Sequence, residues 1–204
     1  MTSCRVSFCL EEKMTAEEKD AFADAHLIEE KLAGRLVHKG IFFDVHQDRI
    51  RLPDGRESTR EYIRHPGAAV ILPLHDDGRV VLVRQFRYTI DRVVLEFPAG
   101  KLEDNEGPLV CAQRELQEET GYTASDWRYI GTIHNALGYS DEALYFYLAR
   151  GLKHAAPHPD AEEFIETFSV SLVELSDWVR MGRVTDVKTV VGTFWLEKIL
   201  GQGF

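Results

Sequence analysis

Apolar residues follow strand-like patterns through much of the chain after residue 33. Residues 67–74 form a nearly continuous apolar run, which is typical of a central strand buried on both faces. The turn signal Asp76-Asp77-Gly78 separates this strand from the next. The pattern predicts further strands at residues 79–88, 93–100 and 164–172, and two more within 127–152 around a loop at 137–142.

Helical patterns occur in four places: residues 11–32, 108–120, 173–182 and 185–200. The first is rich in Ala, Glu and Lys, and Thr15 followed by Glu18 is typical of a capping box. Gly121 follows the second pattern, where a left-handed residue commonly closes a helix. We expect the last pattern to be an amphipathic helix.

The N-terminal third has a different organisation from the rest. Residues 34–64 predict a set of short strands, and Pro53-Asp54-Gly55 forms a turn between two of them. So few strands do not form an independent core. We therefore divide the chain into an N-terminal helix and small sheet at residues 1–65 and a main domain at residues 66–204, which must help to bury the first part unless another subunit does.

One helix carries an unusual concentration of acid. Glu115, Glu118 and Glu119 are spaced so that a helix places all three carboxylates on one face. Like charges at this spacing repel, and a single glutamate there is normally only a solvated helix face. A bound cation accounts for the full set, and a hard divalent ion such as Mg²⁺ prefers carboxylate oxygens.

Composition narrows the classes of function. The 204 residues include 24 Lys and Arg against 34 Asp and Glu, a formal charge of −10, which disfavours general nucleic-acid binding. Three cysteines, Cys4, Cys9 and Cys111, have no metal-ligand spacing, and their odd number favours a reducing cytoplasm. We expect no signal peptide and no membrane span, because no apolar run is long enough.

The acidic helix lies within a longer motif. Gly100, Glu106, Arg114-Glu115-Leu116, Glu118-Glu119 and Gly121 have the spacing of the Nudix box, and the sequence from 100 to 122 resembles that family closely. The resemblance implies an α/β (α+β) fold, in which a Nudix α/β/α sandwich with a mixed sheet accompanies the small N-terminal antiparallel sheet. It also implies hydrolysis of a nucleoside diphosphate linked to another group.

The resemblance assigns roles within and beside the box. Metal ligands would be Glu115, Glu118, Glu119 and the backbone carbonyl of Ala99, with Mg²⁺ as the cofactor and Mn²⁺ as the alternative. Arg114 would neutralise and orient the carboxylates as part of the catalytic machinery.

Residues outside the box resemble the ADP-ribose pyrophosphatase group, notably 84–88 and 95–100. In that group the N-terminal sheet is exchanged across a homodimer, and the substrate lies between subunits. The resemblance implies a substrate-binding set of Phe42, Arg60, Arg84, Arg87 and Glu96, although packing or solvated charge also accounts for each residue alone.

The general base comes from a loop outside the box in this group. Glu163 is the favoured candidate, followed by Glu162 in the same polar loop and by Glu142. Leu137 stands where the group usually has a proline, sixteen residues beyond Gly121. A GDP-mannose hydrolase, or another nucleotide-sugar hydrolase, therefore remains the alternative to an ADP-ribose enzyme. A non-catalytic nucleotide-sensing domain is disfavoured because every glutamate of the box is present.

Overall fold

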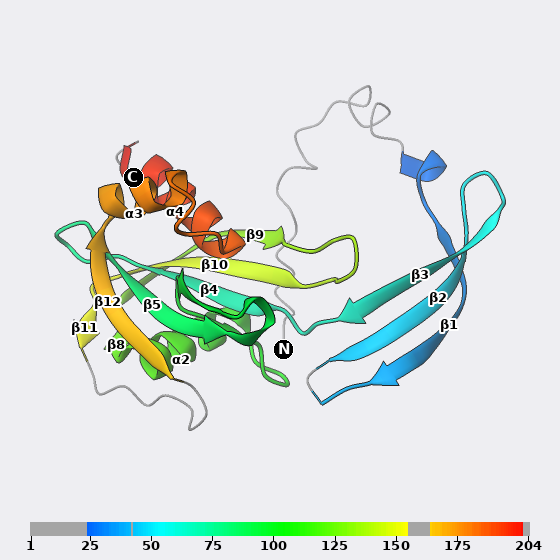
Figure 1. The fold of residues 1–204 in the computed structure, drawn as a ribbon, viewed down its shortest axis with the longest axis horizontal. Coiled ribbons are helices and arrows are strands. Elements are labelled where there is room, and N and C mark those ends of the chain that lie inside the picture. The colour runs from blue at the N-terminus through cyan, green and yellow to red at the C-terminus, as the bar shows by residue number, and fades with distance from the viewer. Residues whose placement is uncertain (1–23, 42, 155–163, 202–204) are drawn as a thin grey trace, which may run out of the picture. The chain divides into compact units, whose positions relative to one another are not determined.

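The computed structural model describes residues 24–41, 43–154 and 164–201, and the chain divides into two compact units, residues 1–62 and 63–204 (Figure 1). The N-terminal unit contains an antiparallel β1-β2 pair and has the strand order β1-β2-β3. Its elements are η2 (Asp24–His26), β1 (Glu30–Lys39), β2 (Asp44–Arg51) and β3 (Glu57–Arg64), the last of which ends just beyond the boundary.

The helix predicted at residues 11–32 is wrong in its described part. Only a 3-10 turn is present at 24–26, and β1 begins at Glu30. Glu30 lies opposite Arg51 in the β1–β2 register, and their side chains form a 2.6 Å ion pair. Pairing with β2 thus overrides the helix propensity of this Glu- and Lys-rich segment. Thr15, Glu18 and the rest of the pattern up to residue 23 lie outside the described residues.

The C-terminal unit is an α/β/α sandwich. Its strands are β4 (Ala68–Pro73), β5 (Arg79–Arg87), β6 (Arg92–Glu96), β7 (Ala99–Lys101), β8 (Tyr122–Thr123), β9 (Asp126–His134), β10 (Ala143–Arg150), β11 (Lys153–His154) and β12 (Ile165–Ser171). Its helices are η3 (Tyr88–Ile90), α2 (Pro108–Thr120), α3 (Leu172–Arg180) and α4 (Val187–Gly201). No helix in the described ranges has the length and apolar character needed to cross a membrane.

The strands of this unit form a mixed arrangement, as expected. One sheet has the order β7-β4-β10-β9, and a second has the order β12-β5-β6. The β10–β4 pair is parallel, whereas β10–β9, β4–β7 and β5–β6 are antiparallel. A short β11-β8 pair is separate from both.

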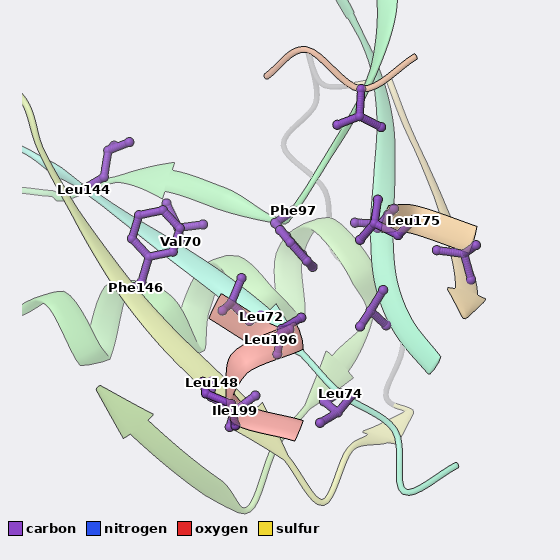
Figure 2. Close-up of a cluster of buried hydrophobic side chains, with 14 of the residues drawn as sticks. Val70, Leu72, Leu74, Phe97, Leu144, Phe146, Leu148, Leu175, Leu196 and Ile199 are labelled. Atoms are coloured by element: carbon purple, nitrogen blue, oxygen red, sulfur yellow. The ribbon is translucent and has the colours of Figure 1, made fainter. Parts of the chain in front are cut away.

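Side chains of β4 alternate between two cores. Val70 and Leu72 pack with residues of α3 and α4 such as Leu175 and Leu196 (Figure 2). Ala69 and Ile71 join Cys111, Ala112 and Leu116 of α2 in the other core. Since β4 is buried on both faces, its continuous apolar sequence is explained, and α2 lies on the side of the strands opposite α3 and α4 (Figure 1).

Two expectations for this unit need correction. The single strand predicted at 93–100 is two strands, because Pro98 has no N–H and the N–H of Phe97 donates to Thr189 Oγ1 rather than to a neighbouring strand. The last helix does not have a simple apolar face either. Lys188 and Thr189 are buried on α4, whereas Phe194 is half exposed.

Candidate active site

Helix α2 is set by local signals at both of its ends. Gly107 is its N-cap and Pro108 occupies its first turn, where a missing N–H costs nothing. Gly121 closes it in the left-handed region with φ 70°, and its N–H donates to the carbonyl of Gln117. Since one face of α2 is buried in the core, the remaining face carries the charged residues of the box.

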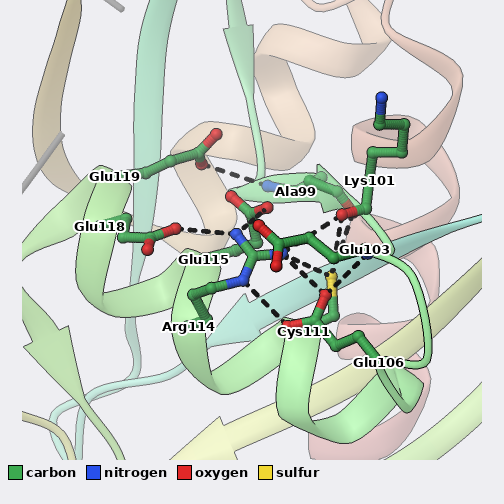
Figure 3. A network of polar contacts seen from close by, with 10 residues as sticks. Ala99, Lys101, Glu103, Glu106, Cys111, Arg114, Glu115, Glu118 and Glu119 are labelled. Carbon is green, nitrogen blue, oxygen red and sulfur yellow. Dashed lines mark hydrogen bonds and ion pairs between the residues drawn. The ribbon is translucent and has the colours of Figure 1, made fainter. Parts of the chain in front are cut away.

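Arg114 is the centre of the polar network on α2 (Figure 3). Its Nε and Nη2 each donate to a carboxylate oxygen of Glu106, both at 2.9 Å. Its Nη1 donates to Glu115 at 2.7 Å and to Glu118 at 2.8 Å. One guanidinium thus binds three carboxylates, which reduces their mutual repulsion and fixes their orientation.

Glu106 is strongly held in its ionised form. The hydrogen bonds from Arg114 lower the pKa of its carboxyl to about 2, and the backbone N–H of Glu103 adds a further hydrogen bond at 3.0 Å. Its side chain is only 9% exposed. Glu106 therefore anchors Arg114 in the position from which it reaches the two helix glutamates.

The loop before α2 lies directly against these carboxylates. A Cβ added to Gly100 would come within 1.8 Å of Glu115 Oε1, so only glycine allows this approach. The N–H of Ala99 donates to Glu119 Oε2 at 3.2 Å. Behind the loop, burial raises the pKa of the Cys111 thiol to about 12, so this cysteine has no thiolate character at neutral pH.

The donor set of this region suits a hard divalent cation. Glu115, Glu118 and Glu119 offer carboxylate oxygens beside the backbone of Ala99, which are the ligands Mg²⁺ prefers. Within the described residues, however, no three His, Cys, Asp or Glu side chains already converge as an ion would require. Arg114 and the Ala99 N–H engage oxygens of these carboxylates, so an incoming ion would compete with them.

A second polar network lies at the other end of the 96–100 segment. Arg87 donates to both oxygens of Glu96, at 2.6 and 2.7 Å, and Lys188 Nζ also donates to this carboxylate. Glu96 is 2% exposed. Its burial opposes ionisation, but the Arg87 hydrogen bonds and the Lys188 charge outweigh that effect and lower the pKa of the carboxyl. Asp186 Oδ1 lies 3.1 Å from Lys188 Nζ and completes the network.

The other predicted site residues are not gathered at this helix. Arg84 lines a different pocket with Leu95 and Trp178, because residues three apart on a strand lie on opposite faces. Arg60, in the N-terminal unit, donates to Glu29. Glu142 Oε1 lies 3.5 Å from His65 Nδ1. Phe42, Glu162 and Glu163 lie outside the described residues.

Sequence reasoning missed Asp186, Lys188 and Thr189. Lys188 is 9% exposed, and lysine is rarely buried without a partner. The signal that was available is this lysine, which is the one charged residue in the mostly apolar stretch from 187 to 196. It indicates a buried partner but not which one, because Glu96 is 92 residues away.

Comparison with known protein families agrees with this geometry. The NUDIX domain family matches residues 63–187. The nucleoside diphosphate sugar hydrolase N-terminal domain family matches residues 29–63. The two matches together cover most of both units.

Several characterised relatives are similar over most of the chain. ADP-ribose pyrophosphatase of Bacillus subtilis is 36% identical over 173 residues, which cover 84% of this chain and 94% of the relative. The enzyme of that name from Mycobacterium tuberculosis is 33% identical, with 80% of each chain covered. GDP-mannose pyrophosphatase of Salmonella arizonae is 33% identical over 67% of this chain and 75% of its own.

A solved structure described as an ADP compounds hydrolase has the same fold. It superposes with a TM-score of 0.78 and covers 87% of this chain and 97% of its own, at 23% sequence identity.

Proposed function

The chain belongs to the NUDIX domain family, and on that premise we propose that it hydrolyses the pyrophosphate bond of a nucleoside diphosphate sugar. The favoured substrate is ADP-ribose, which would give AMP and ribose 5-phosphate. The observation that carries this proposal is the group of carboxylates on α2 held by Arg114 against the Ala99-Gly100 loop. The relatives named ADP-ribose pyrophosphatase support the choice of substrate.

Each residue of the site has a task in this reaction. Glu115, Glu118, Glu119 and the Ala99 carbonyl would hold Mg²⁺, or Mn²⁺ in its place. When bound, such an ion neutralises charge on the pyrophosphate and polarises the attacking water. Arg114 orients the carboxylates and offsets part of their repulsion, and Arg87 offers a cationic group to the anionic substrate beside Glu96.

The general base of the reaction is proposed to be Glu163 or Glu162. Glu142, the third candidate, faces His65 at 3.5 Å in the structure. We expect glutamine at one of positions 162 and 163 to slow turnover by about a hundredfold or more, because a general base contributes at least that factor. Glu142→Gln should have a mild effect in the same steady-state assay, and equal mild effects of all three variants would place the base elsewhere.

The assembly and location are proposed from the same family resemblance. We propose a homodimer in which the small sheet β1-β2-β3 is shared between subunits, and a cytoplasmic location. Phe42 and Arg87 of one subunit would then contact the substrate, and Arg60 would reach it from the other subunit. Light scattering of the purified protein should give the mass of two chains, and an active monomer would contradict the shared site.

A substrate panel tests the reaction itself. Purified protein with Mg²⁺ would be incubated with ADP-ribose, ADP-glucose, GDP-mannose, NADH and diadenosine polyphosphates, and released mononucleotides would be measured by chromatography. We expect AMP from ADP-ribose at the highest rate. Faster release of GMP from GDP-mannose would favour the alternative suggested by Leu137 and by the GDP-mannose pyrophosphatases. No release from any compound would favour a nucleotide-sensing domain.

A further inference from the structure

The first two turns of α4 approach residues 96 and 97 at three points. Lys188 Nζ donates to the buried carboxylate of Glu96. Thr189 Oγ1 accepts a hydrogen bond from the N–H of Phe97 at 2.9 Å. The backbone of α4 also approaches closely, since a Cβ added to Gly192 would come within 2.9 Å of the Phe97 ring.

Asp186 holds these α4 side chains in place. Its Oδ2 accepts hydrogen bonds from the Thr189 N–H at 2.9 Å and from Thr189 Oγ1 at 2.7 Å. Its Oδ1 pairs with Lys188 Nζ at 3.1 Å. Thr189 is fully buried and its hydroxyl both donates and accepts, so its one rotatable group has no remaining freedom.

The same short segment is held at its other end by α2. Glu119 accepts a hydrogen bond from the Ala99 N–H, and the Glu115 carboxylate lies against Gly100. Residues 96–100 are therefore fixed between two helices, with α4 on Glu96 and Phe97 and α2 on Ala99 and Gly100. Pro98 lies between the two pairs of contacts, and its fixed φ limits how far one pair can move without the other.

We propose that Asp186, Lys188 and Thr189 form a positioning clamp that sets the Ala99-Gly100 loop against the α2 glutamates and so determines the affinity of this site for a divalent cation. This proposal rests on the proposed function, which places the cation there. Mutation of residues that orient metal ligands without touching the ion typically lowers metal affinity about ten- to hundredfold. We therefore expect a measurable effect on affinity from residues of the clamp.

The hydroxyl of Thr189 gives the sharpest test. Thr189→Val keeps the shape of the side chain but leaves the Phe97 N–H unpaired, whereas Thr189→Ser retains the hydroxyl. Thr193→Val is the matched control, because Thr193 is equally buried on α4 but bonds only within the helix, to the Thr189 carbonyl at 2.7 Å. Thermal unfolding of all four proteins would confirm that each is folded.

The expected results separate a clamp from general stabilisation. In a Mn²⁺ titration followed by electron paramagnetic resonance, Thr189→Val should raise the dissociation constant about tenfold, with Thr189→Ser and Thr193→Val near wild type. Hydrogen exchange of the Ala99 amide, measured by NMR without metal, should accelerate only in Thr189→Val. Equal Mn²⁺ affinity in the two valine variants would overturn the clamp.

Substitutions of Lys188 test the clamp independently of the Thr189 hydroxyl. Lys188→Met removes the charge that faces Glu96 and should weaken Mn²⁺ binding, and Lys188→Arg should restore it at least in part. If wild type binds no Mn²⁺ and hydrolyses nothing, the proposed function fails and the clamp fails with it. If wild type binds and hydrolyses but Lys188→Met and Thr189→Val bind equally well, only the clamp is wrong.

Discussion

The two polar networks that flank residues 96–100 differ in their balance of charge. Around α2, three carboxylates contact one guanidinium, since Arg114 binds Glu106, Glu115 and Glu118. Near α4, two cations face two carboxylates: Arg87, Lys188, Glu96 and Asp186. The charges of the balanced network near α4 cancel one another. In the acid-rich network around α2, a further cation would offset the excess negative charge. Charge excess, rather than the number of ion pairs, therefore marks the end of the segment at which we propose that the cation binds.

Burial distinguishes Glu96 from Glu118, one carboxylate of each network. Glu96 is almost fully enclosed, so its charge is tolerable only because two cations contact it. Glu118, by contrast, keeps 32% of its side chain exposed, and Arg114 keeps 26%. Each network thus joins enclosed carboxylates to a partly exposed arginine, since Arg87 also keeps 43% of its side chain exposed, and Glu118 is the carboxylate that an incoming ion can reach most easily.

Removing one carboxylate from the acid-rich network should have the largest effect. Glu119→Gln keeps the hydrogen bond from Ala99 possible but removes a charged ligand, so turnover should fall by at least about a hundredfold while folding is retained. Steady-state kinetics with ADP-ribose and circular dichroism provide the two measurements. Glu174→Gln, on the exposed surface of α3, is the matched control. Near-normal turnover in Glu119→Gln would refute the metal site.

Removing the guanidinium should change the response to acid. The pKa of Glu106 falls from 4.5 to about 2 because of Arg114, so the pair stabilises the folded state above about pH 4.5, and this stability is lost as pH falls toward 2. In Arg114→Met the loss of stability over that window should be smaller, and metal affinity should fall about ten- to hundredfold.

Urea unfolding between pH 2 and pH 6 without metal ions measures this difference. Arg180→Met is a suitable control, because its ion pairs on α3 and with α4 are exposed and lie outside both networks. An unchanged acid response in Arg114→Met would mean that Arg114 does not hold Glu106 ionised.

Local signals explain how much of this molecule the sequence predicts. Helix α2 begins and ends as expected because Pro108 favours a helix start and Gly121 favours a helix end, and each acts within one turn. The strands of the main domain follow from apolar runs for the same reason. The Nudix spacing identifies the acid-rich network because all of its members lie within 23 residues.

The balanced network was not predictable in the same way. Its contacts join Glu96 to Lys188 across 92 residues, and no local pattern encodes such a pairing. The helix predicted at Glu30 is wrong for a related reason, since the strand there depends on pairing with β2 rather than on local propensity. Arg84 and Arg87 differ for a local reason, because they are three residues apart on β5 and strand alternation places them on opposite faces.

The smallest expected effect concerns that pair of arginines. Arg87→Gln breaks a bidentate contact with buried Glu96 and should raise the KM for ADP-ribose about tenfold, because hydrogen bonds to charged groups contribute about 1.5–3 kcal/mol. Arg84→Gln removes only an exposed pair with Glu166, and exposed pairs contribute about 0–1 kcal/mol, so KM should change by less than about twofold. Steady-state kinetics on the two variants decides the point. A larger effect at Arg84 than at Arg87 would show that substrate binds on the Trp178 side of β5, and the balanced network would then have no contact with the substrate.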